Sequence, residues 1–303
     1  VALWLAGRIA MASAALPVAS VALADMLFPA ALCLVAGREV LAAGNRRNYP
    51  IVAVLALLAL ANAGYHLAAT GYLPGIERSF LFLLMHTVLL LVTIIGGRVV
   101  PNFTANWMRA QNIADPPVNH SLIDRLTIAS TLVLGVLASL RPSATVTGTV
   151  ALLVALLQAV RLSQWRGFAT LRNPLLFVLH VSYGWLPLGY ALLALAILGG
   201  IGTSSGALHA LAMGGIGSMI LSMMTRVPLG HTGRPLHASR LTVAAYLVMI
   251  VAVLLRVASS FAGPHYADFV GLAAIAWGLS FAIFLYVYAP ILTAPRLQNR
   301  NPS

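Results

Sequence analysis

Three histidines in long apolar stretches are the residues of this sequence whose chemistry most needs explaining: His66, His86 and His209. An ionisable side chain inside a membrane-spanning segment is costly, and by default it suggests a function. Imidazole is a common axial ligand of haem iron, and it also binds copper well. We therefore treat all three as candidate ligands of haem or copper. The alternative is that each makes one hydrogen bond between helices.

A methionine-rich stretch follows His209, and Met213 is its first methionine. Thioethers are soft ligands for copper(I), so Met213 is a further candidate metal ligand, although methionine also fills irregular apolar packing. The same stretch is rich in glycine, which predicts close helix contacts and either a central place in the bundle or a position against a flat cofactor. The single cysteine, Cys33, lies in an apolar run and predicts neither a disulfide framework nor a thiolate metal site.

Two segments resemble each other, residues 94–107 and 222–235. Each contains Arg-Val, then a nearby proline, then a threonine six residues after the arginine. The pairs are Arg98 with Thr104 and Arg226 with Thr232. Each segment lies at the end of an apolar stretch that carries a histidine near its opposite end. This arrangement predicts a four-helix repeat whose corresponding helices line a common centre. A chance match between apolar sequences is the alternative.

Arginines at these boundaries have two interpretations. Arg98 and Arg226 are candidates to hold haem propionates or a phosphate through bidentate contacts. The alternative is that they set topology and extend to lipid headgroups. Polar residues of undecided role near the same boundary are Thr104, His180, His231, Thr232 and Arg234.

The elements that position these residues follow from the composition. The chain has 303 residues, of which 60% are hydrophobic and only 8% charged, about a third of the charge of a soluble domain. This excludes a disordered chain or a coiled coil and predicts a multi-pass membrane protein. The formal net charge of +12 comes from arginines scattered singly between apolar runs, so we expect no nucleic-acid partner.

A membrane span needs roughly 20 mainly apolar residues, and ten stretches come near that length. They run near residues 1–17, 19–41, 49–68, 79–100, 122–141, 145–162, 175–199, 206–226, 241–262 and 268–290. A backbone in lipid must satisfy its own hydrogen bonds, so these stretches predict an all-α polytopic helical bundle. We expect one integral membrane domain over residues 1–303.

Arginines concentrate in alternate loops, including Arg161 and Arg166 after the sixth stretch. By the positive-inside rule these loops are cytoplasmic, and so is the C-terminal tail, residues 291–303. In this frame His66, His86 and His209 lie at similar depth in the outer half of the bilayer. His180 lies in the inner third of the seventh stretch.

The stretch 209–235, together with residues 46–67 and 96–109, resembles the NnrS family of bacterial membrane proteins. The resemblance implies a multi-pass protein of the bacterial cytoplasmic (inner) membrane that contains haem and copper and is linked to the nitric oxide response. Members of the family usually have twelve spans and a His-x-His-Glu-Met stretch in the second. This chain lacks that stretch, so we expect an N-terminally clipped twelve-span protein.

The function predicted is therefore haem and copper binding in nitric oxide handling or nitrosative-stress defence, with the lipid bilayer and nitric oxide as partners. Whether nitric oxide is turned over, sensed or sequestered stays open. The electron donor is unknown, since the sequence has no c-type haem attachment or iron–sulfur motif. One alternative is a multi-span transporter without a metal cofactor, although Asp25 is the only acid expected at depth. Another is a scaffold subunit whose histidines only link helices.

Overall fold

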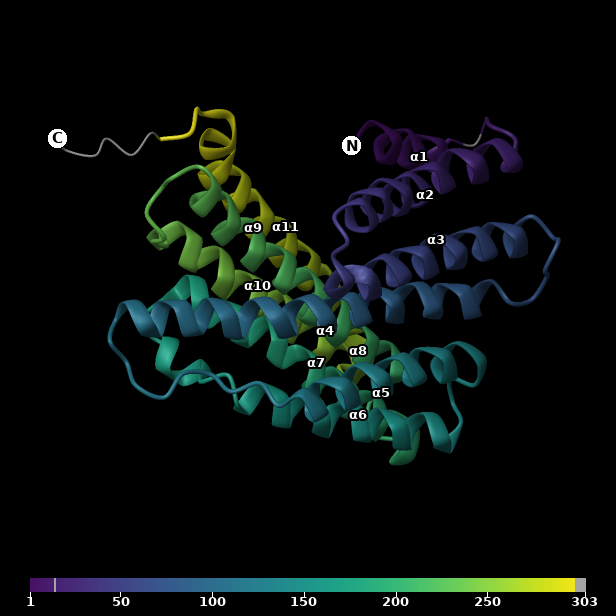
Figure 1. Ribbon diagram of the computed structural model, residues 1–303. Coiled ribbons are helices and arrows are strands. Elements are labelled where there is room, and N and C mark those ends of the chain that lie inside the picture. The colour runs from purple at the N-terminus through teal and green to yellow at the C-terminus, as the bar shows by residue number, and fades with distance from the viewer. Residues whose placement is uncertain (14, 298–303) are drawn as a thin grey trace. The chain divides into compact units, whose positions relative to one another are not determined.

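The computed structural model describes residues 1–13 and 15–297, and every regular element in these ranges is helical (Figure 1). The α-helices are α1 (Ala2–Ala12), α2 (Val18–Ala42), α3 (Tyr49–Ala69), α4 (Glu77–Ala110), α5 (Ser121–Leu140), α6 (Thr145–Ser163), α7 (Pro174–Leu198), α8 (Ser204–His209), α9 (Ser218–His231), α10 (Arg240–Ala258) and α11 (Tyr266–Thr293). A π-helical segment, Ala210–Gly217, joins α8 to α9 into one continuous helix. The predicted all-α fold is confirmed.

Nine helices in the described part of the chain are long and apolar enough to cross a membrane, counting Ser204–His231 as one. The predicted polytopic bundle is thus confirmed, and nine of the ten predicted stretches reach span length. The other, α1, has 11 residues instead of the predicted 17 or so. At 1.5 Å per residue it covers only about half of the hydrocarbon core. The predicted tail 291–303 begins within α11, and residues 298–303 lie outside the described ranges.

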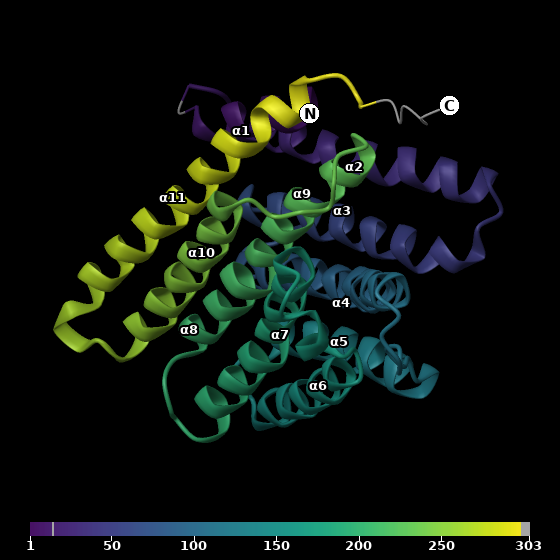
Figure 2. The same cartoon turned by 90° about the vertical axis from the view of Figure 1, so that its left-hand side faces the viewer.

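The chain divides into two compact units. Unit 1 comprises residues 1–94 and 131–143, and unit 2 comprises residues 95–130 and 144 onward. In unit 1, α1 packs on α2 and α2 packs on α3. In unit 2, α6 pairs with α7, and α10 pairs with α11, as Figure 2 shows. Because α4 and α5 contribute to both units, one domain over residues 1–303 stays a prediction.

The core of unit 2 forms around α7, which packs against α6, α8, the π-helical segment and α9. Its buried apolar residues include Leu175, Val178 and Trp185. The helix Ser204–His231 has a larger buried share than any other candidate span, which agrees with the central place predicted for it. A Cβ at Gly214 would collide with the ring of Trp185, so a small residue is required where these helices approach.

Candidate functional site

His86 lies on α4 within unit 1 and is 1% exposed. Its Nδ1 donates a hydrogen bond to the Phe82 carbonyl oxygen at 2.9 Å, and its ring stacks on that of Phe82. On the opposite side α5 approaches closely, since a Cβ at Gly135 would lie 3.0 Å from the His86 Cβ. A buried charge without a counter-charge is costly, so the ring is neutral and Nε2 carries a lone pair. This Nε2 is buried and has no hydrogen-bond partner among the described residues.

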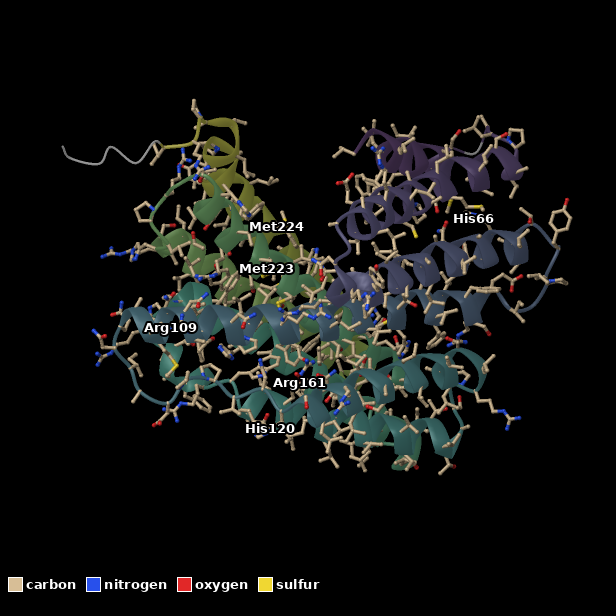
Figure 3. The ribbon with its side chains drawn as sticks, viewed as in Figure 1. His66, Arg109, His120, Arg161, Met223 and Met224 are labelled. Atoms are coloured by element: carbon tan, nitrogen blue, oxygen red, sulfur yellow. The ribbon has the colours of Figure 1, made fainter. Side chains whose placement is uncertain are left out.

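His66 lies on α3 of unit 1 (Figure 3), and a carboxylate holds its ring. Its Nε2 lies 3.0 Å from Oδ2 of Asp25, a buried residue of α2. The same carboxylate forms an ion pair with Arg8 and accepts a hydrogen bond from Asn62 Nδ2 at 3.1 Å. Nε2–H therefore points at Asp25, and Nδ1 is the nitrogen left with a lone pair. The sequence places Asp25 at depth, but only the packing of α2 on α3 shows that it orients His66.

His209, at the end of α8 in unit 2, uses both ring nitrogens. Nδ1 donates to the Ser205 carbonyl oxygen at 2.7 Å, and Nε2 accepts from Arg256 Nη2 at 3.0 Å. Arg256 also donates to Ser259 Oγ. A guanidinium on Nε2 occupies its lone pair and would repel a metal cation, so this geometry argues against His209 as a ligand. Sequence reasoning missed Arg256 because it lies within an apolar stretch 47 residues away.

Met213 lies in the π-helical segment and packs, partly buried, against the apolar core cluster of unit 2. Its surroundings are those of a packing residue. Within the described residues, neither unit gathers three or more His, Cys, Asp or Glu side chains that could hold a metal ion. The copper ligands predicted from the sequence therefore have no preformed group around them in either unit.

Thr104 and His180, both of undecided role in the sequence, meet in unit 2. Thr104 Oγ1 donates to the Val100 carbonyl oxygen at 3.0 Å and lies 2.9 Å from His180 Nε2. The threonine has a single hydroxyl proton, so it can donate either to this carbonyl or to His180 Nε2, and in the first case Nε2–H donates to Thr104. Nδ1 of His180 is buried, and it has no partner among the residues that the structure describes.

The remaining predicted residues are scattered over unit 2. Arg226 is buried, and its guanidinium carbon lies 4.4 Å from the centroid of the Phe103 ring. Arg98 is half-buried on α4. His231 is the last residue of α9 and is exposed. Thr232 comes directly after it, and its hydroxyl donates to the Pro228 carbonyl oxygen at 2.7 Å. Nη1 of Arg234 is buried without a hydrogen-bond partner in the described ranges.

Comparison with known proteins decides the family. Residues 1–296 match the family model described as NnrS protein, which is nearly the whole chain. The chain belongs to the NnrS family. No curated protein and no solved structure matches it significantly. The resemblance seen in the sequence is thereby confirmed.

This NnrS-family chain also contains a buried polar cluster that sequence reasoning missed. Arg161, assigned to a cytoplasmic loop, lies instead on α6 (Figure 3). It is 2% exposed. Its Nε donates to Asp124 Oδ1 at 2.6 Å and its Nη1 to the Tyr183 hydroxyl at 3.0 Å. The Tyr183 hydroxyl in turn donates to Gln158 Oε1 at 2.6 Å. A Cβ at Gly97 of α4 would collide with the Arg161 guanidinium, so that glycine makes room for the cluster.

The four buried or partly buried histidines of this NnrS-family chain differ in which nitrogen is free. Nδ1 is bonded to Cγ, the ring carbon that carries Cβ, and therefore lies close to the helix backbone. A porphyrin whose iron was bound to Nδ1 would collide with that backbone. Nε2 points away from the backbone and can meet a flat macrocycle. His66 and His180 have Nδ1 free, and His209 has neither nitrogen free. Of the four, His86 alone offers Nε2, so it is the histidine that fits haem iron.

Proposed function

We propose that this NnrS-family membrane protein binds haem through Nε2 of His86 and acts in nitric oxide handling or nitrosative-stress defence. The observation that carries the proposal is the buried lone pair of His86 Nε2. A buried polar atom without a partner costs about 1–3 kcal/mol. A bond to haem iron would satisfy it, and bound haem would supply the metal to which a diatomic ligand such as nitric oxide binds.

The residues around His86 support this role by fixing its ring. The bond from Nδ1 to the Phe82 carbonyl selects the tautomer in which Nε2 is the acceptor, as is usual behind metal-bound histidines. Stacking on Phe82 and the close approach of α5 at Gly135 restrict the ring's rotation. The ligand is thereby preorganised before any cofactor binds.

Copper belongs to the proposal only through the family resemblance. His66, oriented by Asp25, has a lone pair on Nδ1, but the described residues of unit 1 supply no second and third ligand beside it. The proposal therefore assigns no role to copper. The inner-membrane location and the cytoplasmic C-terminus are likewise proposals, and the arginine-rich alternate loops support them.

The test is the optical spectrum and pyridine haemochrome of the purified membrane protein, with metal analysis of the same sample. We expect haem in the unsubstituted protein and its loss in His86→Ala. His209→Ala is the matched control, because it removes an imidazole whose nitrogens are both already engaged. We expect that variant to keep its haem.

Two results would contradict the proposal. Haem bound equally well by a folded His86→Ala protein would remove His86 from the site. A colourless, metal-free preparation, even when haem is supplied during expression, would favour a transporter instead. In that case the buried Asp25 with its partners His66 and Arg8 would be the centre to study.

A further inference from the structure

A cavity of about 740 Å³ lies in unit 2 between α6, α7 and the short helical turn Gly167–Thr170. Four residues of α7 line it as one stripe along the helix: Phe177, Val181, Gly184 and Pro187. All four are only partly buried, although most of α7 is buried. The stripe rises about 15 Å at 1.5 Å per residue, which is half of a hydrocarbon core of about 30 Å. The apolar wall of the cavity therefore matches the depth of one leaflet.

Positive charge lies at the end of the cavity where α6 ends and α7 begins. Ser163 and Arg166 line the cavity there, and both are exposed. Arg172 lines a second cavity, of about 650 Å³, and Phe168 lies in the walls of both cavities. Within the described ranges no acidic residue lines either cavity, so these walls do not balance the charge of the two arginines.

The backbone at Arg166 gives no reason for an arginine. Its φ of +57° lies in the left-handed region, which few side chains adopt. The other non-glycine residues with positive φ in the described ranges are Asn112 and Asp115, whose types accept this region most readily. Glycine would adopt it without strain. A strained arginine at the mouth of a cavity therefore indicates a role for its side chain.

An apolar wall of leaflet depth with cations at one end fits an amphipathic anion. A soluble phosphate would leave the apolar wall uncovered, and an uncharged lipid would leave the arginines without a partner. Two copies of the chain that met at this face by two-fold symmetry would bring like charges together. His180 also lines the cavity, but its Nδ1 is buried and its Nε2 is hydrogen-bonded to Thr104, so Arg166 and Ser163 are the polar groups that a ligand reaches.

We propose that this cavity binds an anionic phospholipid, one of whose acyl chains lies along the α7 stripe while Arg166 pairs with the headgroup phosphate. Arg172 adds a second positive charge beyond the turn. Phe168, which is 85% exposed, gives the lipid a further apolar contact. The proposal concerns binding alone. It depends neither on haem at His86 nor on which side of the membrane is cytoplasmic.

The experiment is native mass spectrometry of the purified, delipidated full-length chain, titrated with phosphatidylglycerol or with phosphatidylethanolamine of the same acyl chains. Both lipids carry the phosphate, but an ammonium group neutralises phosphatidylethanolamine. We expect the first phosphatidylglycerol to bind at least about fivefold more tightly. A fivefold ratio corresponds to about 1 kcal/mol, the contribution of one arginine beside an anionic lipid surface.

Variants of Arg166 test the charge. Arg166→Gln should abolish the preference for phosphatidylglycerol, and Arg166→Lys should keep most of it. Arg296→Gln is the matched control, because it removes the charge of an exposed arginine that lines neither cavity. Arg166→Gly should also lose the preference, while its midpoint of thermal unfolding in lipid-free detergent is unchanged or higher, since glycine relieves the positive φ.

A variant of the apolar wall tests the acyl chain. The nearest atom to a Cβ at Gly184 is the Leu162 Cδ2, at 3.7 Å, so Gly184→Leu fills the cavity. Both lipids should then bind more weakly while helix content is unchanged.

Three results would overturn the proposal. The first is equal binding of the two lipids. The second is a preference that survives in folded Arg166→Gln or that Arg296→Gln lowers equally. The third is a dimer in the same spectra that excludes lipid, because a second copy would then cover this face.

Discussion

Helix α4 and the helix Ser204–His231 are the two segments that the sequence pairs, yet they use matching residues differently. Each has a histidine whose Nδ1 donates to the carbonyl oxygen four residues earlier: His86 to Phe82, and His209 to Ser205. The second nitrogen then differs. On α4 it is a buried lone pair, whereas on the other helix Arg256 occupies it. The two histidines therefore make the same hydrogen bond within their own helix but differ at Nε2. The difference comes from Arg256, which lies on another helix.

The matching threonines differ as well. Thr104 is buried inside α4 and its hydroxyl is hydrogen-bonded to His180, whereas Thr232 follows the end of α9 and its hydroxyl bonds only to carbonyl oxygens of its own helix. A π-helical segment directly after His209 shifts the register of its helix, and α4 has no such interruption. Equal spacing from arginine to threonine therefore does not place the residues in equal surroundings. The four-helix repeat stays a prediction.

The largest difference in stability is expected between two glycine-to-alanine variants, one on α4 and one on α9. Gly97→Ala would force a Cβ against the Arg161 guanidinium and disrupt its pairing with Asp124. The arginine of this ion pair is buried and its aspartate is partly exposed. Breaking a fully buried pair costs about 3–5 kcal/mol, so we expect a loss of up to this size and a clear fall in the midpoint of thermal unfolding in detergent. Gly230→Ala is the control, because the nearest atom to its new Cβ is 4.0 Å away. It should be neutral or slightly stabilising. Equal effects of the two substitutions would contradict the close approach at Gly97.

The paired threonines should also separate in stability. Thr104→Val leaves Nε2 of the buried His180 without its hydrogen-bond partner, which should lower the free energy of unfolding by about 1–3 kcal/mol. Thr232→Val, at the helix end, should change it by less than about 0.5 kcal/mol. Chemical denaturation of both variants in the same detergent measures the difference. A larger loss for Thr232→Val would reverse the comparison.

The smallest effect concerns the contact between the two compared helices, where Arg226 lies over the ring of Phe103. Phe103→Leu removes the aromatic face and should cost about 0.5–2 kcal/mol, the range of a cation–π pair from exposed to desolvated. Phe168→Leu is the matched control, because Phe168 is 85% exposed. The measurement is again the midpoint of thermal unfolding. A cost no greater than that of the control would remove the cation–π contact as a source of stability.

The apolar stretches by themselves determine the helices and the membrane class of this protein. A backbone in lipid must bond within its own segment, so composition over about 20 residues is enough to predict a span. Part of each histidine's environment can be predicted in the same way, because in a helix the carbonyl oxygen four residues earlier always lies within reach of the side chain. His86 and His209 are therefore alike as far as the sequence shows.

Only the tertiary structure decides which ring nitrogen is free. Asp25 beside His66, Thr104 beside His180 and Arg256 beside His209 all come from other helices. The packing of helices brings these partners together, and no periodicity within a single apolar stretch encodes it. The free nitrogen in turn decides whether a histidine can bind the iron of a porphyrin. The site chemistry of this chain is therefore set by contacts between helices, while its fold class is set within them.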